Sequence, residues 1–248
     1  MTASLPAMGL MCVLLVAPVA STWAGDDEAA RTLPPDLSFG PSLGSRPNGI
    51  VLQRVPAPDT DTIRLAVSKA SIDRIEDLGG RERLVRLDRF GRKLDHELRA
   101  ALADTRALVL DLRSNRGGNL QRMLRAAARL TGPVHDALTL TSNEDTRPLA
   151  IPAPQGAVWQ GPITVLVGTN TRSSGEVLAA LLRRHAGAKV LGERTFGKDY
   201  VLRVEPISQE WRALIPSSRI KVPGEDLAGG LIPDGPIPVA LASRFSIN

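Results

Sequence analysis

The stretch Pro162–Lys198, with the sequence PITVLVGTNTRSSGEVLAALLRRHAGAKVLGERTFGK, decides the fold of this chain. Its continuous apolar run at 163–167 is typical of a buried strand. Residues 176–185 then show the apolar spacing of a helix, and Gly187 stands where a helix C-cap is expected. A second short strand is predicted at 190–191. A strand, a helix and a strand in this order predict an α/β core.

The same alternation extends on both sides of this stretch. Apolar residues at helical spacing predict helices over 94–102 and 120–130, and a continuous apolar run predicts a buried strand over 107–112 between them. Further strands are predicted at 50–55, 63–67, 84–87, 213–215 and 219–222, and the residues between 67 and 84 are expected to form a polar connection through Gly79-Gly80.

Composition divides the chain into three segments. Residues 1–24 contain no Asp, Glu, Lys, Arg or His, and their apolar run over 10–19 precedes small residues that suit a cleavage site. We interpret them as a secretory signal peptide, because the run is shorter than the roughly 20 apolar residues of a spanning helix; an uncleaved anchor is the alternative. Residues 25–60 are a Pro- and Gly-rich arm, and residues 61–248 are the folded domain. This division predicts an exported protein, periplasmic or extracellular.

The composition also argues against several classes of function. The single cysteine, Cys12, lies in the predicted signal, so a cleaved chain has no thiol for a disulfide, a nucleophile or a metal. His96, His135 and His185 lack the spacing of metal ligands, so neither a metal nor a cofactor is predicted. The net charge of +5 suits an acidic partner, but only 3% of residues are aromatic. We therefore expect no nucleic-acid binding and, at most, a weak contact with an anionic envelope surface.

Ser173 is the first candidate for chemistry. It follows the predicted strand at 163–167 and opens a helix that starts near Glu176, where free N–H groups and the positive end of the helix dipole collect. A serine at such a place can attack a carbonyl group, and the N–H of Ser174 is a natural donor to the resulting oxyanion. The alternative is structural, because residues 173–176, Ser-Ser-Gly-Glu, also form a capping box.

Lys198 is the second candidate, at the end of the run Thr195-Phe196-Gly197-Lys198 and 25 residues after Ser173. A lysine becomes a general base when burial lowers its pKa, and Phe196 offers an apolar wall for such a site. The alternative is an ordinary solvated lysine. A third element, the turn DLRSNRGG at 111–118, presents Gly117 and Gly118, whose N–H groups can bind an anion. The alternative there is a simple strand-to-helix turn.

These motifs together resemble one family in order and spacing, the C-terminal processing, or tail-specific, serine peptidases. The similar segments are Ala107–Leu120 (ALVLDLRSNRGGNL), Pro162–Glu176 (PITVLVGTNTRSSGE), Val190–Lys198 (VLGERTFGK) and Gly230–Asp234 (GLIPD). The resemblance covers roughly residues 60–240. It implies an α/β fold with a spiral core of β-β-α units, like that of ClpP and crotonase.

The resemblance also implies roles for particular residues. Ser173 matches the nucleophile and Lys198 the general base, and the N–H groups of Ser174 and of Gly117 or Gly118 match the oxyanion hole. The implied activity is serine-type hydrolysis of peptide bonds in exported polypeptides, near their C-termini, without a cofactor.

Several positions depart from the family pattern. Arg172 stands beside the nucleophile where a small residue is usual, and Leu202 replaces the polar residue that commonly orients the lysine. Arg184 occupies a position that is acidic in some members. Both arginines, if close to Lys198, would lower its pKa. Residues 25–83 are too few for the PDZ domain that captures substrate tails. These departures leave a second hypothesis open, a peptide-binding pseudoprotease of the same fold.

Overall fold

The computed structural model describes residues 51–54, 70–208 and 211–243. The predicted signal at 1–24 and the predicted strand at 63–67 lie outside the described residues, as does the arm at 25–60 apart from one strand. That strand, β1 (Val51–Arg54), matches the prediction at 50–55. No helix in the described part of the chain is long and apolar enough to cross a membrane.

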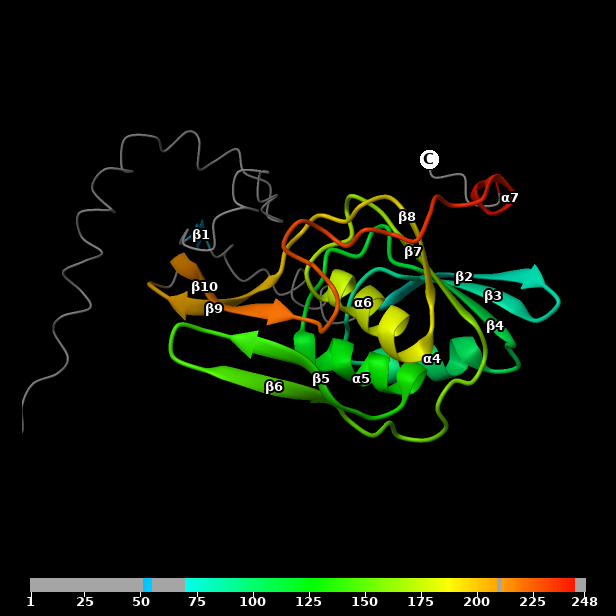
Figure 1. Ribbon diagram of the computed structural model, residues 1–248, viewed down its shortest axis with the longest axis horizontal. Helices are drawn as coiled ribbons and strands as arrows, with labels where there is room; N and C mark the ends of the chain where they lie inside the picture. Colours follow the sequence, from blue (N-terminus) through cyan, green and yellow to red (C-terminus); the bar gives the residue numbers. More distant parts are fainter. Residues whose placement is uncertain (1–50, 55–69, 209–210, 244–248) are drawn as a thin grey trace, which may run out of the picture. The chain divides into compact units, whose positions relative to one another are not determined.

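A five-stranded sheet forms the centre of the fold, with the strand order β2-β3-β4-β7-β8. The strands β3 (Glu82–Leu87), β4 (Ala107–Asp111), β7 (Ile163–Val167) and β8 (Lys189–Gly192) run parallel. The helices α4 (Leu94–Leu102), α5 (Leu120–Thr131) and α6 (Ser174–Ala186) connect them or the second sheet and lie side by side (Figure 1). The predicted α/β fold is therefore confirmed, and α4 and β7 have the predicted bounds.

Alternation along the strands explains why their apolar runs are continuous. Leu110 and Val165 belong to the large core that α4, α5 and α6 share with the sheet. Their neighbours Val109 and Leu166 belong to a smaller cluster, against which Leu241 of the short helix α7 (Val239–Ala242) packs. Because successive side chains of a strand point to opposite faces, a strand buried on both faces must be apolar at every position.

The edge strand β2 (Ile72–Gly79) corrects one prediction. Its residues were expected to be a polar connection, but they pair antiparallel with β3 through a turn at Gly79 and Gly80. Most of the β2 side chains are exposed, so the strand carries little of the apolar signal that identifies buried strands.

A second sheet has the order β1-β10-β5-β6, with β9 paired to β10. Its strands are β5 (Val134–Thr141), β6 (Thr146–Ile151), β9 (Tyr200–Pro206) and β10 (Trp211–Lys221). The β5–β6 hairpin was not predicted. The two pieces predicted at 213–215 and 219–222 form one strand, which passes Pro216 with a shift of register between Pro216 and Ser218. Proline removes a ladder donor, so it makes such a strand look interrupted in sequence.

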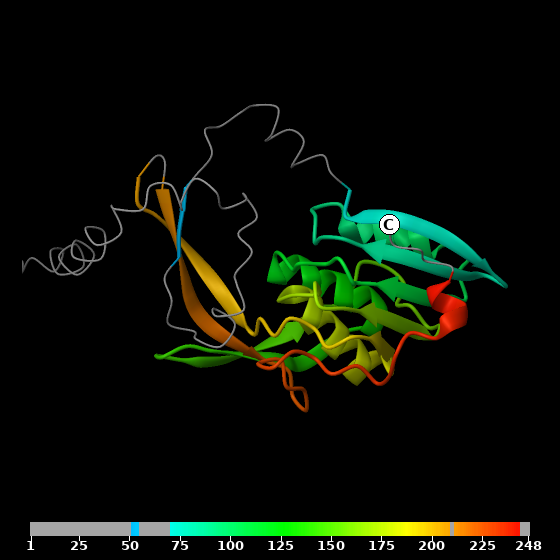
Figure 2. The same cartoon turned by 90° about the horizontal axis from the view of Figure 1, so that it is seen from above.

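After β10 the chain returns to the first sheet, as the orange-to-red trace in Figure 2 shows. The N–H of Asp234 donates to the carbonyl of Val190, and the N–H of Gly192 donates to the carbonyl of Gly235. The outer edge of β8 is thereby covered, so this side of the sheet offers fewer unpaired backbone groups.

Candidate active site

Ser173 stands at a sharp turn between β7 and α6. Its backbone angles, φ 51° and ψ −122°, lie outside the regions that residues with a side chain usually adopt. Such a conformation costs about 1–3 kcal/mol and persists only where the surroundings hold it. Two hydrogen bonds from backbone N–H groups hold it here: the N–H of Arg172 donates to the carbonyl of Asn115 at 2.9 Å, and the N–H of Ser173 donates to the side-chain Oε2 of Glu176 at 2.7 Å. A strained strand-to-helix turn of this kind exposes a nucleophilic hydroxyl.

The glycine turn lies directly against this serine. A Cβ on Gly117 would come within 2.9 Å of the Cβ of Ser173, and Gly117 has a φ of +92°, so only glycine suits the position. The hydroxyl of Ser174 donates to the carbonyl of Gly118 at 2.9 Å and joins the turn to the first residue of α6. The structure thus brings together all three predicted oxyanion residues and Ser173.

The backbone N–H groups of the three predicted oxyanion residues differ in whether they already have a hydrogen-bond acceptor. Gly117 donates its N–H to Oδ1 of Asn115 at 2.9 Å. Ser174 is the first residue of α6, so its N–H has no acceptor within the helix. Among the described residues, neither the N–H of Ser174 nor that of Gly118 has a hydrogen-bond acceptor. Of the two glycines that the sequence left open, Gly118 is therefore the one whose N–H is available to an oxyanion.

Asn115 positions both parts of the site, a role that the sequence did not reveal. It is fully buried, its Nδ2 donates to the carbonyl of Leu87 at 2.9 Å, and its Oδ1 and backbone oxygen hold Gly117 and Arg172. A Cβ on Gly175 would lie 2.9 Å from Asn115 Oδ1, so the small residue at the start of α6 lets this side chain approach.

Glu176 joins the serine segment to the lysine segment. This buried carboxylate accepts four hydrogen bonds, from the Thr195 hydroxyl (2.5 Å) and the Gly197 N–H (2.6 Å) at Oε1, and from the Ser173 N–H (2.7 Å) and the Lys198 N–H (2.9 Å) at Oε2. Burial raises the pKa of Glu176, and the four donors oppose that shift. The capping box therefore forms as predicted on the glutamate side, and the same carboxylate does more than cap α6.

The contacts of Glu176 limit how far apart Ser173 and Lys198 can lie. Because Oε2 of Glu176 accepts from both nitrogens, at 2.7 and 2.9 Å, the backbone nitrogens of Ser173 and Lys198 are at most about 5.6 Å apart, the sum of these two distances. Residues separated by 25 positions in sequence are thus adjacent in space.

Lys198 has a lowered pKa. Burial is the main cause, the positive charge of Arg172 adds to it, and the negative charge of Glu176 opposes it. The ring of Tyr200 faces the Lys198 ammonium, with 5.4 Å between Nζ and the ring centroid. Phe196, which the sequence suggested as a wall for the lysine, stacks under the Arg172 guanidinium, 4.1 Å from its central carbon.

The other departures from the family pattern lie where they do not orient the lysine amine. Arg184 is exposed in the last turn of α6, about 16 Å along the helix axis from Ser173, and it does not contribute to the shift of the Lys198 pKa. Leu202 lies in β9 in register with Pro216 and has no polar group. The backbone of Lys198 is held by Glu176 instead.

A serine at a helix N-terminus, free N–H groups beside it and a half-buried lysine of lowered pKa are features that a serine hydrolase with a lysine base requires. Residues 83–236 match the model of peptidase family S41, and the chain belongs to this family. Within the described residues, no group of three His, Cys, Asp or Glu side chains could hold a metal ion.

Similar proteins support the same family. The chain is 29% identical over 160 residues to a carboxyl-terminal-processing protease of Picosynechococcus sp., which covers 59% of this chain and 38% of that protein. It is 36% identical over 106 residues to a carboxyl-terminal-processing protease of Synechocystis sp., covering 43% of this chain and 24% of the relative. The chain therefore spans well under half the length of these curated relatives.

Solved structures share the fold. The photosystem II D1 C-terminal processing protease matches with a TM-score of 0.55 and 23% identity, over 77% of this chain and 48% of that one. A lipoprotein from Streptococcus agalactiae matches with a TM-score of 0.61 and 17% identity, over 81% of this chain and 77% of that one.

Proposed function

We propose that this chain is a serine endopeptidase that cleaves peptide bonds of exported polypeptides, near their C-termini, with Ser173 as nucleophile and Lys198 as general base. The observation that carries the proposal is the Glu176 carboxylate, which binds the backbone N–H groups of both residues at 2.7 and 2.9 Å. The carboxyl-terminal-processing relatives support the same class of substrate. Export, to the periplasm or beyond the cell, rests on the signal-like composition of residues 1–24.

The chemistry proceeds in two halves. Neutral Lys198 takes the proton of the Ser173 hydroxyl as its oxygen attacks the scissile carbonyl carbon, and the N–H groups of Ser174 and Gly118 bind the oxyanion. The ammonium of Lys198 then gives the proton to the leaving amine, which leaves an acyl-enzyme. Water attacks the acyl-enzyme while Lys198 takes its proton. As the ester bond to Ser173 breaks, Lys198 returns that proton to the Ser173 oxygen, and the peptide leaves with a new carboxyl group. Both halves need Lys198 to begin neutral, which its lowered pKa favours.

The second candidate is a peptide-binding pseudoprotease that keeps the fold with little turnover. The apolar Leu202 favours it, because no polar group at that position aims the amine of Lys198.

A fluorophosphonate probe separates the two candidates, because it reacts with an activated serine and needs no known substrate. We expect the purified protein to be labelled, and expect Ser173→Ala and Lys198→Ala to abolish labelling. Lys189→Ala, which removes an exposed lysine of β8, is the matched control and should label like the unmodified protein. Folded protein that resists the probe would contradict the peptidase and leave the peptide-binding candidate.

A further inference from the structure

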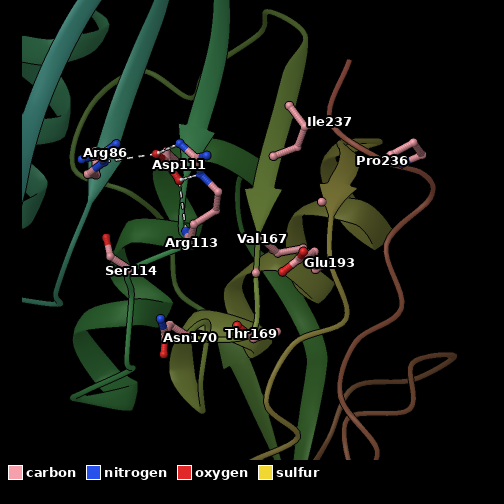
Figure 3. A pocket seen from close by; sticks show the side chains of 12 residues that line it. Arg86, Asp111, Arg113, Ser114, Val167, Thr169, Asn170, Glu193, Pro236 and Ile237 are labelled. Atoms are coloured by element: carbon pink, nitrogen blue, oxygen red, sulfur yellow. Dashed lines mark hydrogen bonds and ion pairs between the residues drawn. The ribbon is translucent and has the colours of Figure 1, made fainter. Parts of the chain in front are cut away.

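A cavity of about 490 Å³ lies at the carboxyl edge of the first sheet, apart from Ser173 and Lys198, and none of the roles above uses it. The ends of β3, β4, β7 and β8 and the segment at 236–237 line it (Figure 3). Ligands of open parallel sheets bind beyond the carboxyl ends of the strands, so the position suits a ligand. The volume also lies in the range of small-ligand sites.

One wall carries a fixed group of charges. Asp111 is buried and accepts bonds from Arg113 Nε (2.9 Å) and Nη2 (2.8 Å) and from Arg86 Nε (3.1 Å). A further bond comes from the backbone N–H of Arg113 at 3.1 Å. Burial opposes ionisation of Asp111, but its bonds to Arg113 and the charges of both arginines outweigh burial and lower its pKa. The carboxylate therefore stays ionised, and its acceptor positions are filled by these four donors.

Arg86 is the group in this wall with donors to spare. Within the described part of the chain only its Nε takes part in a bond, to Asp111, so its two terminal nitrogens remain available. The side chain is only 20% exposed, and its one bond fixes the direction in which the guanidinium faces. The two terminal nitrogens of Arg86 therefore offer positively charged N–H donors on this wall, which favours an anionic group, above all a carboxylate.

The other walls of the cavity indicate which chemical groups can lie beside that anion in a ligand. Pro236 and Ile237 lie across the cavity from Arg86 and Asp111, and Val167 adds to this apolar side (Figure 3). Glu193 is exposed on the same lining and excludes a second anion, but it can accept an N–H. A ligand with a carboxylate at one end, an apolar side chain beside it and N–H groups behind it matches all three features.

We propose that this cavity binds the free α-carboxylate of a peptide chain whose last side chain is apolar, with Arg86 holding the carboxylate and Ile237 contacting the side chain. The proposal rests on the proposed peptidase function and names a feature of its substrate or product. Thr169 and Asn170, which also line the cavity, lie in the loop that leads to Ser173, so an occupied cavity borders the nucleophile segment.

The test measures binding rather than cleavage, in a Ser173→Ala protein, by fluorescence anisotropy of a dye-labelled hexapeptide that ends in valine. The free acid should bind at least about tenfold more tightly than the C-terminal amide, the value of one good charge-assisted bond. Arg86→Gln should reduce the affinity for the acid to that for the amide. Arg74→Gln, which alters an arginine of β2 outside the cavity, should leave both affinities unchanged. Ile237→Ala should weaken binding of the valine peptide more than that of a glycine-ended peptide.

Other results would overturn the proposal: equal affinity for acid and amide, an Arg86→Gln protein that still distinguishes them, or binding of octanoate without binding of either peptide. Cleavage by the unmodified protein separates the two sources of the carboxylate. If the cavity holds the substrate's own tail, amidation raises KM; if it holds a product, the free-acid peptide inhibits competitively and amidation has no effect on KM. Fluorophosphonate labelling is independent of these measurements, so failure of this proposal is distinguishable from failure of the peptidase function.

Discussion

Replacing Glu176 by glutamine gives the sharpest test of how the site is held together. The carboxylate receives two donors at each oxygen, and an amide can accept at only one of its two ends. If the NH₂ group faced Ser173 and Lys198, it would meet two N–H groups that cannot turn away. If it faces Thr195 and Gly197, the threonine hydroxyl can rotate and accept, so the Gly197 N–H is the only donor of fixed direction that loses its partner. Glutamine should therefore adopt the second orientation.

The magnitude follows from that count. One buried N–H without a partner costs about 1–3 kcal/mol, so Glu176→Gln should lower the free energy of unfolding by that amount. Glu176→Ala removes the acceptor for all four donors and should cost about 3 kcal/mol or more. Because glutamine still holds the N–H groups of Ser173 and Lys198, Glu176→Gln should keep measurable fluorophosphonate labelling, whereas Glu176→Ala should lose it.

Urea unfolding followed by circular dichroism, together with labelling rates, measures both effects. The pH dependence adds a second readout. Burial raises the pKa of Glu176, so at a pH between the unfolded and folded pKa values the folded state keeps a proton that the unfolded state has released. The resulting contribution to stability is complete below the unfolded pKa and is lost as pH rises through the folded pKa. Glu176→Gln should remove that decline. Equal losses of stability and labelling in the two variants would refute the reasoning.

Three further predictions concern the same site. Arg172→Ala removes a positive charge that lowers the pKa of Lys198, so the pH at which labelling rises should move upward; an unchanged pH profile would show that burial alone sets the pKa. Gly117→Ala places a methyl group 2.9 Å from the Ser173 Cβ, at a residue whose φ is +92°. It should abolish labelling and lower the free energy of unfolding in urea by about 1–3 kcal/mol. Full labelling would mean that the turn can move away from Ser173. Ser174→Ala loses one bond to the glycine turn but keeps the N–H, so we expect a loss of about 0.5–1.5 kcal/mol and labelling that is slowed rather than abolished; complete loss of labelling would assign the hydroxyl a larger part.

The sequence was most informative where apolar runs are buried on both sides. The strand at 163–167 and the helix at 94–102 have the predicted bounds, and Gly187 adopts the left-handed conformation of a C-cap. The β2 and β5–β6 strands were missed because exposed strands of mixed composition give no strong periodicity. Their partners, rather than their own residues, determine their conformation.

For the candidate site, residues in local motifs were predicted, whereas roles that depend on long-range contacts were not. Ser173, Lys198 and the glycine turn were predicted from local patterns and family resemblance, and the structure places the serine next to the turn and, through Glu176, next to the lysine segment. The role of Asn115 was not foreseen, because two of its three partners, Leu87 and Arg172, come from distant parts of the chain. The capping box did identify Glu176, but a local motif cannot reveal the three hydrogen bonds that this carboxylate accepts from residues 195–198.

The position of Thr195 has a consequence for synthesis of the protein. Its hydroxyl accepts the N–H of Leu231 at 2.7 Å while donating to Glu176, and its own N–H donates to the carbonyl of the same leucine. The lysine segment is therefore held from one side by a residue that leaves the ribosome more than thirty positions later. Pairings so far apart in sequence form late in folding. A growing chain can complete the strands of its first sheet and the helices α4, α5 and α6 before its serine and lysine segments are locked together, so the site around Glu176 would be the last part to become ordered.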